Sequence, residues 1–388
     1  MNFDLTDEQR AIRELCRDFA REVVAPAAEE NDREHRFPLE IIRQMGKMGL
    51  FGLPFAEEYG GAGGDFLSYC IAIEELGCAD ASVGITLEAA VSLGAGPIHD
   101  FGTDEQKRTL LPDLLAGRKL WAFGLTEAGA GSDAGATRTR ASLEGGEWVV
   151  SGSKQFITNS GTDITAGVTI TAVTGRREGA ARGEISALLV PQGTPGYTVE
   201  PPYRKLGWHA SDTHPLSFDD CRVPEANLLG ARGGGYKQFL HTLTGGRIAI
   251  AALSVGVAQA CLDASLAYAR ERQAFGHPIG RFQAIQFKLA DMATDVEVAR
   301  MAVYRAACEY ERGAGEVTGE LRRLASMAKL FASTISKRAA DEAVQIHGGY
   351  GFIEEYPVAR YYRDVKINEI GEGTSEVQRI LIARELGL

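Results

Sequence analysis

The sequence predicts an α+β fold in three consecutive parts. These are an N-terminal all-helical domain (1–120), a middle antiparallel β-barrel or sandwich (121–231) and a C-terminal four-helix bundle (232–388). The first part places apolar residues at helical intervals. The second holds short runs of β-branched and aromatic residues between turn signals, without the helices that a parallel sheet needs. The third contains long Ala-rich segments that no proline interrupts, which is typical of a bundle.

The N-terminal part begins with a helix-start signal. Thr6 and Gln9 have the spacing of a capping box, in which each side chain satisfies the other residue's backbone N–H. We expect the helix that follows to end at Pro26, because proline removes a helical donor. Further helices are expected over 39–48, 66–77, 82–94 and 103–116, with a Gly-rich loop at 59–64.

The middle part has the residue pattern of short strands, and the C-terminal part has the spacing of apolar residues that is typical of helices. Strands are expected over 147–151, 164–173, 185–190, 197–199 and 216–218. Long helices are expected over 248–272, 282–312 and 321–346, and a last helix capped by Thr374 or Ser375 runs through 381.

Composition excludes several classes of protein. The chain has 388 residues, of which 45% are hydrophobic and 24% charged, so it can bury a sizeable core. Its net charge of 41 − 52 = −11 argues against general nucleic-acid binding, which needs a basic surface. No apolar run approaches eighteen residues and the first residues are acidic, so neither a membrane span nor a secretory signal is expected. The Cys and His spacings favour no metal site.

Two glycine-rich loops are candidates for ligand binding. The run from Gly129 to Gly135 departs from a dinucleotide fingerprint because its third glycine is one place late. It is either a plain turn or a loop whose backbone N–H groups approach a flavin or a phosphate. Glu372 stands between Gly371 and Gly373, and by itself is either a solvated acid or a residue open to a ligand.

Five blocks in the same order resemble the acyl-CoA dehydrogenase family, over the whole chain. They are 125–133, 152–159, 270–276, 343–351 and the Glu372 loop at 370–376. The resemblance implies FAD bound between the β domain and the C-terminal bundle. It also implies oxidation of an acyl-CoA thioester to its trans-2-enoyl product, as in fatty acid β-oxidation or branched-chain amino acid catabolism.

The resemblance places Glu372 at the position of the catalytic base. The base removes the α-proton while a β-hydride passes to flavin N5, and burial should raise the pKa of the acid. Some members carry the base on the first long C-terminal helix, where this chain has Gly246, followed by Arg247. Glycine cannot act as a base, so Glu372 is the base that the resemblance implies.

The resemblance also implies cofactor and substrate contacts. The expected flavin contacts within the chain are Phe123, Leu125, Thr126, Gly131, Ser132, Phe156, Thr158, Thr374 and Glu376. Those expected to reach FAD across a subunit interface are Arg272, Phe275, Gln283, Gln345, Gly348 and Gly349. Ser132, Arg247 and Gly373 are expected to contact the acyl-CoA. A helix-surface position remains the other interpretation of Arg247 and of Arg272.

The chain departs from the family pattern at several of these positions. Phe156 replaces a Trp and Glu376 replaces an amide of other members. Gly371 stands where many members have Tyr, which suggests room for branched or bulky acyl groups. Glu88 and 89–92 fall where the family lines the acyl-tail pocket.

The resemblance further implies partners. Electrons are expected to pass to an electron-transfer flavoprotein, and the assembly to be a homotetramer built as a dimer of dimers. The expected location is the cytoplasm of a bacterium, or the mitochondrial matrix for a eukaryotic chain. The alternatives are an acyl-CoA oxidase or flavin monooxygenase that uses oxygen, and a non-catalytic helical scaffold. The thioester carrier, CoA or an acyl carrier protein, is left open.

Overall fold

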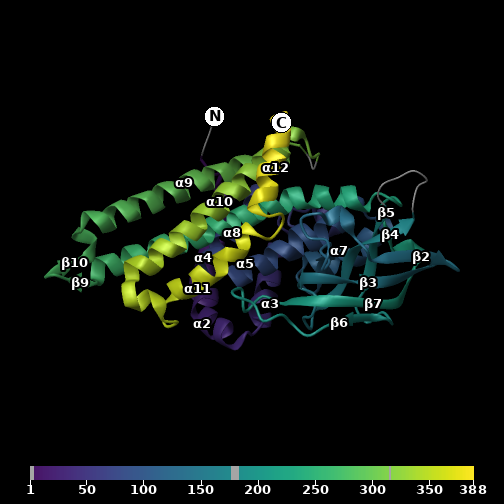
Figure 1. The fold of residues 1–388 in the computed structure, drawn as a ribbon, viewed down its shortest axis with the longest axis horizontal. Helices are drawn as coiled ribbons and strands as arrows, with labels where there is room; N and C mark the ends of the chain where they lie inside the picture. The colour runs from purple at the N-terminus through teal and green to yellow at the C-terminus, as the bar shows by residue number, and fades with distance from the viewer. Residues whose placement is uncertain (1–3, 176–182, 314–315) are drawn as a thin grey trace.

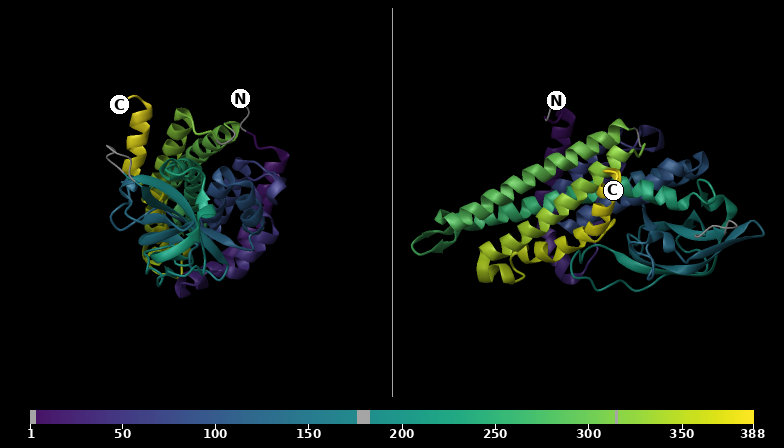
Figure 2. Two further views of the ribbon diagram at one scale, coloured as in Figure 1. Left: turned by 90° about the vertical axis from the view of Figure 1, so that its right-hand side faces the viewer. Right: turned by 45° about the horizontal axis from the view of Figure 1, so that its top comes forward.

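The molecule is elongated, with its β-strands at one end and the tip of a helical bundle at the other (Figure 1). The computed structural model describes residues 4–175, 183–313 and 316–388. Figure 2 shows the sheet seen from its end, with the N-terminal helices to one side of it and the long C-terminal helices extending behind. This arrangement agrees with the helix–sheet–helix order that the sequence predicts.

The N-terminal helix begins as predicted but does not end at Pro26. Helix α1 (Asp7–Phe19) has the capping box: Gln9 N–H donates to Thr6 Oγ1 at 3.2 Å, and Thr6 N–H donates to Gln9 Oε1 at 3.0 Å. The chain then continues through a π-helical turn, η1 (Ala20–Val24), into α2 (Ala25–Glu34). Pro26 lies in the first turn of α2, where a missing N–H costs little. The expectation that it terminates the helix was therefore wrong.

The rest of the N-terminal part is helical. Its elements are α3 (Leu39–Lys47), η2 (Leu50–Gly52), η3 (Glu57–Tyr59), α4 (Phe66–Ala79), α5 (Ala81–Glu88), η4 (Ala89–Ala95), α6 (Gly96–Phe101) and α7 (Asp104–Leu115). Every residue of α5 is buried, and the helix passes directly into η4, which is π-helical. Such π-turns occur frequently at functional sites, so the junction at Glu88 is of interest.

The middle part is one sheet of mixed rather than wholly antiparallel pairing. Its strands are β1 (Leu120–Gly124), β2 (Arg140–Glu144), β3 (Glu147–Thr158), β4 (Thr165–Gly175), β5 (Glu184–Pro191), β6 (Tyr197–Val199), β7 (Thr213–Pro224) and β8 (Leu228–Leu229). The order is β6-β7-β3-β2-β4-β5-β8, and β1 pairs with β4 in parallel. β2 also touches β4 in parallel, through Arg140 and Val173. β1, β2 and β8 were not predicted, and β1 finds its partner about forty residues further along the chain.

The C-terminal part is built on three long helices, α8 (Gly235–Glu271), α9 (Gln283–Arg312) and α10 (Gly319–His347). The shorter elements are β9 (Gln273–Ala274), β10 (His277–Pro278), η7 (Ile279–Arg281), η8 (Gly348–Phe352), α11 (Pro357–Asp364), η9 (Val365–Glu369) and α12 (Ser375–Glu385). α8 begins thirteen residues before the predicted 248, because burial of Gly245 and Gly246 among other elements outweighs their low helix propensity. α11 was not predicted.

Two helical stretches, Ala81–Phe101 and Gly235–Glu271, are long and apolar enough to cross a membrane by length and composition. The sequence expectation had been that no such stretch exists. In both, 83% of the apolar window is buried inside the molecule, as in core helices. They therefore count as weak support for a membrane span.

The central helix α8 crosses α4 at very short range. A Cβ placed on Gly256 would lie 2.1 Å from the backbone oxygen of Glu74 in α4. Because a backbone cannot give way as a side-chain end can, glycine is required at this crossing.

Gly256→Ala is therefore expected to lower the free energy of unfolding by about 1–3 kcal/mol, through overpacking of this crossing. Denaturant unfolding followed by circular dichroism measures the change. Gly245→Ala is the matched control, because a Cβ there meets the Tyr310 ring at 3.4 Å, an ordinary contact. Equal stability of the two variants would contradict the prediction.

Candidate active site

Glu372 lies in the turn between η9 and α12, in a conformation unusual for its residue type. Its φ is +52°, in the left-handed region that non-glycine residues rarely adopt. Thr374 caps α12 as predicted, accepting from Val377 N–H at 3.3 Å, so the turn is anchored on its C-terminal side. Strained backbone of this kind persists only where the surroundings hold it, and it is common at active sites.

The carboxyl group of Glu372 is buried although the residue as a whole is only half-buried. Both carboxyl oxygens are inaccessible to solvent, and neither has a hydrogen-bond partner among the described residues. The group lies against α8 at Gly246, where an added Cβ would be 2.1 Å from Oε2. The absence of a side chain at Gly246 therefore leaves the space in which the carboxyl group sits.

Three side chains hold the backbone of this turn. Lys329 in α10 donates to the Gly373 carbonyl at 2.8 Å, and Gln378 donates to the same carbonyl at 2.8 Å. Arg247 in α8 donates from Nε to the Glu372 carbonyl at 3.4 Å. Arg247 is 5% exposed, which excludes the surface interpretation of this residue. The sequence does not predict Lys329 or Gln378 as site residues, because neither belongs to a local motif.

These surroundings set the acidity of Glu372. Burial raises its pKa to about 7, against the opposing effects of the Glu88 carboxyl, Arg247 and Lys329. Burial likewise lowers the pKa of Arg247 to about 10 and that of Lys329 to about 8. A carboxyl group with a pKa near neutrality can accept a proton at neutral pH and hold it, as a general base must.

The predicted flavin residues of the β domain lie at the end of β1 and on β3. Phe123 stacks on Phe239 of α8 with ring centroids 4.1 Å apart, which joins the sheet to the bundle. Phe156 is 64% exposed with a φ of +62° and lies 5.0 Å from the Tyr203 ring. Leu125 is buried, Thr126 and Thr158 are half-buried and Ser132 is exposed. A Cβ added at Gly129 or Gly131 would meet nothing within 4 Å.

A buried ion pair that the sequence does not predict joins β3 to the segment that follows β1. Lys154 is fully buried and donates to Glu127 at 2.7 Å and to the Leu125 carbonyl at 3.3 Å. Burial alone would raise the pKa of Glu127, but Lys154 and neighbouring donors lower it to about 2. For Lys154 burial outweighs the pairing and lowers the pKa to about 8. Both residues stand inside the 125–133 and 152–159 blocks, but nothing local shows that they meet.

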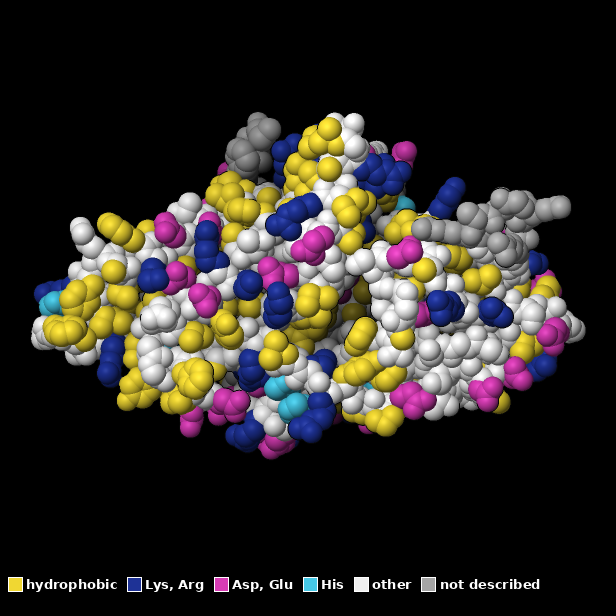
Figure 3. All heavy atoms as spheres, viewed as in Figure 1, with side chains coloured by type: hydrophobic (Ala, Val, Ile, Leu, Met, Phe, Trp, Pro, Cys, Tyr) yellow, Lys and Arg dark blue, Asp and Glu magenta, His cyan; other side chains and the backbone are white. Residues whose placement is uncertain are grey.

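The flavin contacts that are predicted to reach across a subunit interface lie at the opposite end of the molecule from the β domain. Phe275 is 92% exposed, and Arg272 lies over the Tyr350 ring at 5.3 Å. Gln283, Gln345, Gly348 and Gly349 are also exposed. Figure 1 shows β9 and β10 at the tip of the bundle, far from the β domain, and Figure 3 shows hydrophobic side chains gathered over that tip. One chain therefore does not bring the two predicted groups together.

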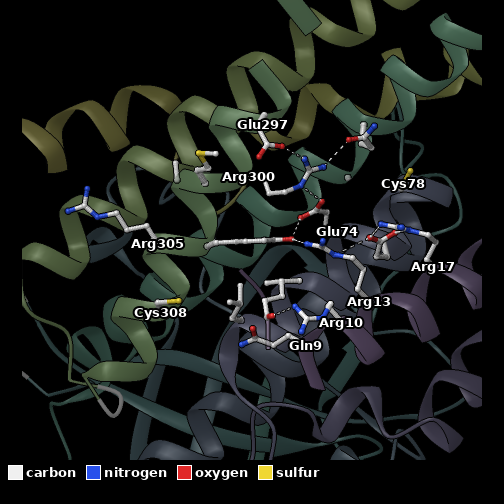
Figure 4. Close-up of a pocket in the computed structure, with 18 of the residues that line it drawn as sticks. Gln9, Arg10, Arg13, Arg17, Glu74, Cys78, Glu297, Arg300, Arg305 and Cys308 are labelled. Carbon is white, nitrogen blue, oxygen red and sulfur yellow. Dashed lines mark hydrogen bonds and ion pairs between the residues drawn. The ribbon is translucent and has the colours of Figure 1, made fainter. Parts of the chain in front are cut away.

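A separate hollow of about 1860 Å³ lies between α1, α4, α8 and α9 (Figure 4). Ion pairs among its charged side chains include Arg17 with Glu75 at 2.8 Å and Arg300 with Glu74 at 2.7 Å. No predicted site residue lines it. This hollow is therefore separate from the surroundings of Glu372.

The residues around Glu372 and β1 fit FAD. The exposed Phe156 ring offers a flat apolar surface, and the open loop at Gly129 and Gly131 lets backbone approach a phosphate. Ser375 Oγ, at the start of α12, is buried without a partner among the described residues, as expected where an anion would approach a helix N-terminus. Helical, sheet and helical parts around such a site define a flavin-dependent oxidoreductase, and this site holds a buried carboxyl group, that of Glu372.

Comparison with known proteins gives the family. Residues 6–118, 122–221 and 233–387 match the acyl-CoA dehydrogenase N-terminal, middle and C-terminal domains. A probable acyl-CoA dehydrogenase of Bacillus subtilis is 53% identical over 386 residues, 100% of both chains. Butyryl-CoA dehydrogenase from Megasphaera elsdenii superposes with a TM-score of 0.95 at 43% identity, covering 100% of both chains.

A second similar structure is described as the electron transferring flavoprotein of Acidaminococcus fermentans. One of its chains has a TM-score of 0.95 at 44% identity, covering 100% of this chain and 99% of that one. The chain belongs to the acyl-CoA dehydrogenase family, whose members are FAD-dependent oxidoreductases.

Lys154→Met is expected to destabilise the protein by about 3–5 kcal/mol, because it leaves the Glu127 carboxylate buried without its cation. Thermal and denaturant unfolding measure the loss. Lys119→Met, at an exposed position, is the control and should change stability little. A Lys154→Met protein as stable as this control would show that the pair contributes nothing net.

Proposed function

We propose that the chain dehydrogenates a short-chain acyl-CoA thioester between Cα and Cβ, with Glu372 as the catalytic base. The observation that carries the proposal is the buried carboxyl group of Glu372, without a hydrogen-bond partner among the described residues and with a pKa near 7. Resemblance to a butyryl-CoA dehydrogenase supports the short acyl chain.

In this mechanism Glu372 accepts the α-proton on a carboxyl oxygen. Burial favours the protonated product of that step and so drives the transfer. Arg247, Lys329 and Gln378 hold the turn's carbonyls, which fixes where the carboxyl group points. The residues assigned below would hold FAD, which would supply the hydride-acceptor chemistry for the β-hydrogen. Since only ionised Glu372 can act, kcat/KM should rise with pH through about 7.

The proposal assigns the other site residues as follows. Contacts to FAD within the chain are Phe123, Leu125, Thr126, Gly131, Ser132, Phe156, Thr158, Thr374 and Glu376, and Ser132, Arg247 and Gly373 contact the acyl-CoA. The exposed group at the bundle tip (Arg272, Phe275, Gln283, Gln345, Gly348 and Gly349) contacts FAD of a second subunit. The 92% exposure of Phe275 supports this assignment, since a large apolar side chain gains most by being covered.

The assembly and partners belong to the same proposal. A homotetramer, as a dimer of dimers, would place each bundle tip against a neighbouring β domain. Similarity to a chain in an electron transferring flavoprotein structure supports an electron-transfer flavoprotein as acceptor. Similarity to a Bacillus protein supports the cytoplasm as location.

The change to strands at Leu120 and back to helix at Gly235 supports domains at 1–120, 121–231 and 232–388.

Glu372→Gln should retain FAD and bind acyl-CoA, yet reduce the flavin at least about 10³-fold more slowly, because the amide cannot accept the α-proton. Stopped-flow bleaching of the flavin by butyryl-CoA measures the rate. Glu369→Gln, three residues away, is the matched control: Glu369 pairs with Lys366 and lies outside the proposed machinery. Near-normal bleaching by Glu372→Gln would show that another group is the base.

The space beside the base allows a second test. A Cβ at Gly371 would meet only the Ile367 carbonyl, at 3.5 Å, so a larger side chain is tolerated there. Gly371→Tyr should lower kcat/KM for branched or aromatic acyl-CoAs about tenfold relative to butyryl-CoA, by narrowing the site. Gly371→Ala is the control. An unchanged ratio in the Tyr variant would reject the idea that Gly371 admits bulky acyl groups.

A further inference from the structure

β3 ends in an irregular segment that carries two of the proposed flavin contacts. The pairing of β3 with β7 shifts its register between Lys154 and Ile157, as at a β-bulge. Phe156 lies within this shift and has a φ of +62°. A bulge turns a side chain out of the regular alternation of its strand, and bulges are common beside active sites. The positions of Phe156 and Thr158 therefore depend on the contacts that hold this segment.

Asn159 follows β3 directly and is held in a left-handed conformation. Its φ is +60° and it is 0% exposed. Its backbone N–H donates to the Asp212 carbonyl at 3.1 Å, and its carbonyl accepts from the Thr165 hydroxyl at 2.9 Å. Asparagine adopts this conformation more readily than most residues other than glycine. The β domain thus fixes the backbone of Asn159 on both sides, and with it the direction of the side chain.

The side chain of Asn159 leaves the β domain and reaches the N-terminal helices. Its Nδ2 donates to the Thr86 carbonyl of α5 at 3.1 Å. Thr86 is 0% exposed and lies shortly before α5 passes into the π-helical η4. Where an α-helix widens into a π-turn, the register of its backbone hydrogen bonds shifts by one residue. A carbonyl near that shift is stabilised by a donor from another element.

The amide of Asn159 also carries a cost. Its Oδ1 is buried without a hydrogen-bond partner among the described residues. A buried acceptor without a partner is unfavourable, and glycine at this position would adopt the same backbone without that cost. The bond to Thr86 is therefore what the amide contributes, and this bond joins the β domain to the N-terminal helices.

We propose that Asn159 is a positioning residue for the flavin. Its amide ties the bulged end of β3 to α5, and this tie sets where Phe156 and Thr158 lie relative to the helices. The inference rests on the proposed function, which assigns Phe156 and Thr158 to the FAD site. Asn159 acts through these two residues and takes no part in proton transfer to Glu372.

The test compares the wild type with Asn159→Gly, which keeps the left-handed backbone and removes the amide. The affinity of the apoprotein for FAD, measured by fluorescence titration, should fall about tenfold through loss of the hydrogen bond. With FAD saturating, kcat for butyryl-CoA should fall about tenfold, because a displaced flavin is poorly aligned with the acyl chain. KM should change less than about twofold, because the proposed acyl-CoA contacts are untouched.

Asn227→Gly is the matched control. Asn227 lies in η6 (Glu225–Asn227), and its amide donates to the Leu189 carbonyl of β5 at 2.8 Å. The control therefore removes the same kind of bond within the β domain, and FAD affinity and kcat should stay close to those of the wild type. Equal losses in the two variants, or no loss in Asn159→Gly, would overturn the proposal. If Asn159→Gly does not fold, Asn159→Ser replaces it, because its side chain is too short to reach α5.

A spectroscopic measurement separates positioning from stability. The visible circular dichroism of bound FAD reports how the protein holds the flavin and needs no turnover. It should differ from the wild type in Asn159→Gly and match the wild type in Asn227→Gly. A less stable Asn159→Gly protein with wild-type dichroism and FAD affinity would show that the bond only stabilises the fold. If no acyl-CoA bleaches the wild-type flavin, the proposed function fails, while the titration and the dichroism still decide the role of Asn159.

Discussion

The burial of one carboxyl group against a helix backbone organises the active site. A carboxylate removed from water is costly unless charges or donors offset the loss of hydration. Here the Glu372 carboxyl group lies against Gly246 of α8, with the Arg247 and Lys329 side chains close by. These cations hydrogen-bond to the turn's carbonyls and leave the carboxyl oxygens open. The result is a carboxyl group that is fixed in place, has a pKa near 7 and can accept a proton.

This arrangement depends on helices that come from distant parts of the chain. α8 packs against both α4 and α10, and the crossing with α4 is so close that only glycine fits at position 256. The turn that carries Glu372 is held by Arg247 of α8 and Lys329 of α10. A change in the packing of these helices would therefore alter the pKa of Glu372.

The distribution of the proposed flavin contacts has a structural consequence. Those on the β domain lie at one end of the molecule and those near β9 lie at the far tip of the bundle, with α12 between the two (Figure 1). Because a single chain cannot bring the two groups to one cofactor, the cofactor site proposed here is complete only in an oligomer. The exposed aromatic side chains at the tip fit a surface that a second copy covers.

Local sequence signals determined the helix–sheet–helix order and the caps at Thr6 and Thr374, because periodicity and capping act over a few neighbours. Tertiary structure alone decided the parallel pairing of β1 with β4, the early start of α8, the helical path through Pro26 and the meeting of Lys154 with Glu127. The physical reason is that burial and charge depend on partners far along the chain, and a single stretch of sequence does not contain its partners.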